Sequence, residues 1–178
     1  MKNSNKKRNY AALRAAYISV ASAVSVVIML IGAFLEIADL ACAMAVSFLV
    51  WFIGIEFGIS DSILCYGVIS VSSFLLLPSK LPVFYFVLLY GWYPSIKLIL
   101  HKKIKIEYIR LIIKSVIILV CVILEEFLAR SLLGYVQTKQ LTAIIVIVSI
   151  IIYIPYDMLL SKLAVLYIKK WRKHIFRQ

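Results

Sequence analysis

About six apolar segments, each long enough to cross a bilayer as a helix, fill most of this 178-residue chain. We place them at residues 10–35, 37–57 and 60–77, in a fourth stretch that begins near residue 82, and at 110–133 and 141–168. These runs are too long for strands and do not alternate apolar with polar residues. The sequence therefore predicts an all-α integral membrane bundle of six transmembrane helices, in one domain over residues 1–178.

Basic residues gather at three places along the chain and predict its orientation. Most of the 20 Lys and Arg residues lie before residue 15, between residues 97 and 114, or after residue 161. Basic segments resist translocation and stay in the cytoplasm. Six spans with both termini inside bring all three clusters to one side. We therefore expect a multi-pass protein of the cell membrane with short basic cytoplasmic tails at 1–9 and 169–178.

Composition argues against several function classes. The net charge of +12 does not indicate nucleic-acid binding, because the positive residues lie at membrane edges, where they fit topology and contact with anionic lipid heads. The chain has no phosphate-binding loop, no dinucleotide fingerprint and no hydrolase or zinc-protease motif. Its three cysteines lie in apolar runs and suit helix packing. We expect no catalytic residue, no metal, no cofactor and no enzymatic activity.

Ionisable residues within spans are costly and deserve separate interpretation. The fifth span contains Glu125, Glu126 and Arg130, of which the last two are four residues apart and can pair along the helix. This EExxxR string resembles the first motif of the CAAX-processing and bacteriocin-immunity membrane proteases. That family needs histidines on later helices, and this chain has only His101 upstream and His174 in the basic tail. Two interpretations remain open, a salt-paired helix end and a substrate-contacting carboxylate.

Other polar and proline residues allow local predictions. Asp157 in the sixth span should lie near the inner boundary and pair with Lys97 or Lys114 at similar depth. Ser60 or Asp61 can cap the third helix. Pro82 suits the first turn of the fourth span, and Pro94 should bend it.

The start of the first span carries small residues at helical spacing. The pairs Ala11/Ala15 and Ala12/Ala16 are four apart, so each pair lies on one helix face. Such faces let another membrane helix approach closely. The partner helix is either within this bundle or in another protein.

With these alanines next to a basic N-terminus, the chain resembles the substrate-binding S components of energy-coupling factor transporters. That resemblance implies six spans with both termini inside, and a first helix whose AxxxA-like face docks on a transmembrane coupling subunit that works with two ATPase subunits. It covers the whole chain in size and topology, but its single motif is short. Rod-shape-determining membrane scaffolds have similar size and span number and remain an alternative. Small multidrug or ion transporters form a third class.

The resemblance also implies where a vitamin or other small solute would bind, namely the outer half of the bundle. The residues expected there are Glu36, Asp39, Lys80, Tyr85, Glu125 and Arg130. Carboxylates outnumber basic groups in this set and its neighbour Glu126, which indicates a solute with positive charge or several hydrogen-bond donors.

The predicted orientation can be tested by labelling. Single cysteines introduced at Ser4, Lys103 and Gln178 should resist a membrane-impermeant thiol reagent in intact cells, because basic segments stay inside. One introduced at Thr138 should react. Reaction of the cysteine at position 103 above the labelling of the unsubstituted protein would overturn the six-span arrangement.

Overall fold

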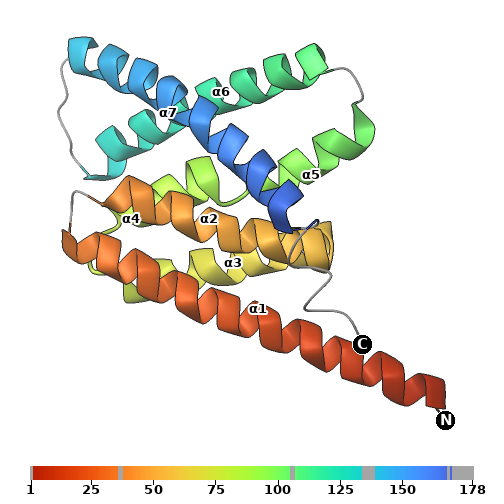
Figure 1. The fold of residues 1–178 in the computed structure, drawn as a ribbon. Helices are drawn as coiled ribbons and strands as arrows, with labels where there is room; N and C mark the ends of the chain where they lie inside the picture. Colours follow the sequence, from red (N-terminus) through yellow and green to blue (C-terminus); the bar gives the residue numbers. More distant parts are fainter. Residues whose placement is uncertain (1, 36–37, 105–106, 134–138, 168, 170–178) are drawn as a thin grey trace. The chain divides into compact units, whose positions relative to one another are not determined.

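The computed structural model describes residues 2–35, 38–104, 107–133, 139–167 and 169. Within these, the side chains at 2–9, 101–103, 107, 111, 125, 126, 129, 130, 132, 133 and 139–150 lie outside the description. All the described elements are helical, which confirms the all-α class (Figure 1). They are α1 (Lys2–Leu35), α2 (Asp39–Glu56), α3 (Ile59–Leu76), α4 (Leu81–Phe84), the π-helix η1 (Tyr85–Tyr90), α5 (Tyr93–Lys103), α6 (Glu107–Leu133) and α7 (Lys139–Leu166).

Four helical stretches are long and apolar enough to cross a membrane, and this is the architecture of a helical membrane protein. They are Tyr10–Leu35, Asp39–Glu56, Ile59–Leu76 and Leu81–Leu100, and they match the first four predicted spans. The predicted fifth and sixth spans coincide with α6 and α7, whose 27 and 28 residues exceed the roughly 20 that a crossing needs. The count of six spans and the cytoplasmic position of both termini stay predictions.

The chain forms two compact units, Met1–Ile112 and Ile113–Gln178. In the first unit, α1 lies beside both α2 and α3, and α2 also packs against η1 and α5 (Figure 1). Its fully buried side chains include Met29, Ile53, Ile69 and Phe86. Large apolar side chains also cover the outside, among them Val20 on α1 and Val71 on α3, at 64% and 63% exposure. An apolar exterior around an apolar core is what lipid-facing helices require. The prediction of one bundle over residues 1–178 stays a prediction.

Two glycines bring helices of the first unit close together. A Cβ on Gly32 of α1 would lie 2.9 Å from Cys42 Cβ on α2. A Cβ on Gly54 of α2 would lie 2.6 Å from Leu98 Cδ1 on α5 and 3.1 Å from Ser62 on α3. Gly54 therefore marks the point where three helices meet.

The turn between α2 and α3 differs from its predicted chemistry. Gly58 is the N-cap of α3, with φ at 108°, a left-handed conformation that favours glycine. Neither Ser60 nor Asp61 caps the helix, since no side-chain hydrogen bond is made at that end. The prediction of a side-chain cap was wrong because the Asp61 carboxylate bonds to Arg14 of α1 instead.

The fourth span is interrupted rather than simply bent. Pro82 lies in the first turn of α4, as predicted. After η1 the chain passes through a bend at Gly91 and Trp92, and α5 begins at Tyr93 with Pro94 in its first turn. Pro94 thus starts a new helix, where its missing N–H costs little, instead of bending the interior of a continuous one. Pro155, by contrast, lies inside α7.

The glycine contacts generate a stability prediction. Gly54→Ala should lower the melting temperature, because its Cβ overlaps Leu98 in a closely packed junction; overpacking costs about 1–3 kcal/mol. Gly67→Ala on α3 is the matched control, since a Cβ there meets nothing within 4 Å. Thermal unfolding of both purified variants should separate them. Equal melting temperatures would show that the three-helix junction tolerates the extra methyl group.

Candidate functional site

Lys80 is bound to the end of α3. Its Nζ donates to Phe74 O at 2.6 Å and to Leu77 O at 2.7 Å, and it lies 5.2 Å from the centre of the Phe74 ring. A helix C-terminus leaves carbonyls unpaired and carries partial negative charge, so an ammonium there satisfies both requirements. This contact accounts for Lys80 within the fold. A role in binding solute stays a prediction.

The other predicted solute contacts are distributed over both units. Asp39 is buried in the first turn of α2, and Tyr85 is half-buried as the first residue of η1. Glu36 lies outside the described residues, as do the side chains of Glu125 and Arg130 and of their neighbour Glu126. The structure therefore brings Asp39, Lys80 and Tyr85 into one unit and leaves their joint role untested.

An ion pair joins α1 to α3. Arg14 Nη2 donates to Asp61 Oδ1, and the two side chains are 40% and 5% exposed. Asp61 Oδ2 is buried and accepts no hydrogen bond from the described residues. The pair is therefore asymmetric: the arginine reaches outward, whereas the carboxylate is enclosed and depends on it.

Aromatic contacts fix the same side of α1. Tyr10 and Tyr17 both pack on Phe57 at the end of α2, with ring centroids 6.3 and 5.6 Å apart. Together with Arg14 these residues stand at i, i+4 and i+7, which is one helix face. The four alanines are exposed, and helical geometry turns them away from this face.

Buried hydroxyl groups connect α2, α3 and α5. Ser62 and Ser95 share a hydrogen bond of 2.8 Å, and Ser62 Oγ lies 3.1 Å from Val50 O, to which it can donate. Both serines are at most 3% exposed. This cluster lies beside Gly54 and holds the start of α5 against α3.

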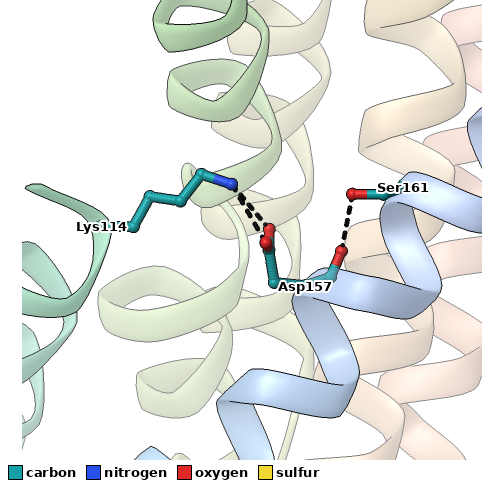
Figure 2. A network of polar contacts seen from close by, with 3 residues as sticks. All are labelled: Lys114, Asp157 and Ser161. Carbon is teal, nitrogen blue, oxygen red and sulfur yellow. Dashed lines mark hydrogen bonds and ion pairs between the residues drawn. The ribbon is translucent and has the colours of Figure 1, made fainter. Parts of the chain in front are cut away.

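In the second unit, Asp157 pairs with Lys114 (Figure 2). Lys114 Nζ lies 3.0 and 3.1 Å from the two carboxylate oxygens, and Ser161 Oγ donates to Asp157 O at 3.0 Å. The Lys114 side chain is 7% exposed. This confirms the prediction that Asp157 pairs with Lys114 or Lys97.

Sequence reasoning missed the Arg14–Asp61 pair and the Ser62–Ser95 contact. One signal was available for the first, namely an arginine within an apolar helix, which needs a partner. None was available for the second, because serine is common in membrane helices and its partner depends on how the helices pack.

No protein-family model, curated protein or solved structure matches this chain. Its function is therefore argued from its own residues.

The asymmetric ion pair predicts unequal effects of its two halves. Arg14→Leu should reduce stability the more of the two, because it strands a buried carboxylate. Asp61→Asn should reduce it by only about 1 kcal/mol, since the arginine can turn to water. Thermal unfolding checks the order, and Arg14→Leu combined with Asp61→Asn should recover part of the loss. A larger effect of Asp61→Asn would contradict this account.

Proposed function

We propose that this chain is the substrate-binding membrane subunit of an energy-coupling factor type importer. It would carry a vitamin or other small solute, powered by partner ATPase subunits, with both termini in the cytoplasm. The observation that carries this proposal is the uncovered alanine face of α1, formed by Ala11, Ala12, Ala15 and Ala16. A transmembrane coupling subunit is the expected occupant.

The position of this face supports docking over internal packing. The opposite side of α1 already holds the bundle through Tyr10, Arg14 and Tyr17. Tyr10 is level with Phe57 at the end of α2, so α1 runs on past the bundle toward its N-terminus (Figure 1). The small side chains of the alanine face permit close backbone contact, which is how helices associate in lipid.

The solute would bind in the outer half of the bundle. The expected contacts in the first unit are Asp39, Lys80 and Tyr85, and those expected from the sequence alone are Glu36, Glu125 and Arg130. A solute with positive charge or several hydrogen-bond donors suits these carboxylates. The chain would capture it from outside and reorient with its partners, and would perform no chemistry itself.

One observation favours the alternative, a non-enzymatic membrane scaffold. Several polar groups of the first unit have structural partners: Lys80 bonds to the end of α3, Arg14 of α1 to Asp61 of α3, and Ser62 of α3 to Ser95 of α5. A scaffold needs such contacts and no solute pocket.

The docking experiment substitutes Ala15 or Ala16 with tryptophan in the tagged full-length chain. Each change should abolish co-purification with an energy-coupling transmembrane subunit and its ATPases, identified by mass spectrometry, because the large ring prevents close helix approach. The melting temperature should stay near that of the unsubstituted protein, since these side chains are exposed.

Val24→Phe is the matched control, because Val24 is 45% exposed on the same helix but outside the alanine face. It should leave co-purification intact. Unfolding by the alanine substitutions would show that their face packs internally. Recovery of cell-wall or division proteins, in place of ATPase subunits, would support the scaffold.

A further inference from the structure

The interruption of the fourth span is a shift in its backbone hydrogen bonding. Residues 85–90 form a π-helix inside the apolar stretch Leu81–Leu100. The Gly91 N–H donates to Phe86 O at 2.6 Å, five residues back, instead of to Val87 O, four residues back. Short π segments inside helices are frequent at functional sites.

Two side chains donate hydrogen bonds to the backbone carbonyls whose α-helical partners are lost in this shift. Tyr66 of α3 donates its hydroxyl to Val87 O at 3.1 Å, the acceptor that Gly91 would use in an α-helix. Trp92 donates its indole Nε1–H to Leu88 O at 2.7 Å, the acceptor that its own backbone N–H would use. A carbonyl oxygen can accept two hydrogen bonds, so what separates the two donors is space: the Tyr66 ring lies against Gly91 while its hydroxyl holds Val87 O.

Packing makes this arrangement specific to glycine. A Cβ on Gly91 would lie 2.6 Å from Tyr66 Cδ2 and 2.8 Å from Phe86 O. The Tyr66 ring also packs on Phe86, with centroids 5.8 Å apart. Only a residue without a side chain leaves room for the ring and for the Gly91–Phe86 hydrogen bond.

The segment after the shift is firmly held. Ser95 bonds to Ser62 of α3, and Leu98 packs at Gly54 of α2. A change of hydrogen-bond register would therefore be taken up within η1, which packs on α2, and would leave α5 in place. Tyr85, at the start of η1, would change direction with it.

We propose that residues 85–92 form a two-state switch in the fourth span, held in its π form by the Tyr66 hydroxyl. When Tyr66 leaves Val87 O, the Gly91 N–H moves from Phe86 O to Val87 O, and η1 becomes α-helical. The two arrangements differ in the carbonyl to which the Gly91 N–H donates, Phe86 O in the π form and Val87 O in the α form, and a hydrogen-bond register has no intermediate position, which makes them discrete alternatives. This inference does not depend on the proposed transport function or on any solute.

The test follows the Trp92 indole N–H by NMR in the full-length protein, reconstituted in lipid nanodiscs and labelled with ¹⁵N-tryptophan. The chain has three tryptophans, so the spectrum is simple, and Trp92→Phe assigns the relevant peak. Tyr66→Phe should shift the equilibrium about fivefold toward the α form, the effect of losing one hydrogen bond, and should move or split the Trp92 peak. Gly91→Ala should move the peak in the same direction, because its Cβ displaces the ring.

The variant carrying both changes should show no shift beyond that of Gly91→Ala, since the added Cβ at position 91 already displaces the Tyr66 hydroxyl from Val87 O. Tyr108→Phe is the control, because Tyr108 is 83% exposed on α6. An unmoved Trp92 peak in Tyr66→Phe would overturn the switch. So would a joint displacement of the Trp51 and Trp92 peaks, which indicates general loosening, or additive shifts in the double variant.

Discussion

Lipid offers no hydrogen bonds, so each polar group within an apolar helix must find its partner inside the protein. The described contacts follow from this constraint. Lys80 donates to carbonyls at the end of α3, and the Asp61 carboxylate accepts from the guanidinium of Arg14. Within the π-helix, Val87 O accepts from the Tyr66 hydroxyl and Leu88 O accepts from the Trp92 indole N–H. The helices are thereby registered against one another at a few fixed points, while apolar contact fills the space between them.

The same constraint makes function hard to infer from polar residues alone. A charged side chain in a span attracts a functional interpretation, yet Lys80 and the Lys114–Asp157 pair have structural partners that account for them. The alanines of α1 are different, because they are exposed and no described helix covers them. The proposed docking role therefore rests on an exposed surface that permits close helix approach, and not on a polar cluster.

The helices could be predicted from the sequence because a long apolar run in lipid satisfies its backbone hydrogen bonds by forming a helix. Proline or glycine marks several of the helix ends. Pairing of Asp157 was predictable because depth along a helix follows from counting residues. The Arg14–Asp61 pair and the π-helix were not, since both depend on which faces of separate helices meet. Asp61 was predicted to cap α3 because its position next to the helix start favours that role. In the structure its carboxylate bonds instead to Arg14, which is distant in the sequence. For the solute site, the sequence supplied residues but no pocket geometry.

The Arg14–Asp61 contact joins positions 47 residues apart, and this separation has a consequence for biosynthesis. Arg14 leaves the ribosome well before Asp61 does. During that interval the guanidinium has no counter-ion, but it can stay at the aqueous boundary, toward which it still reaches in the folded protein. The enclosed partner is the one that arrives last: Asp61 follows the tight turn at Gly58 and meets a cation that is already present. The order of synthesis thus supplies the counter-ion ahead of the carboxylate that depends on it.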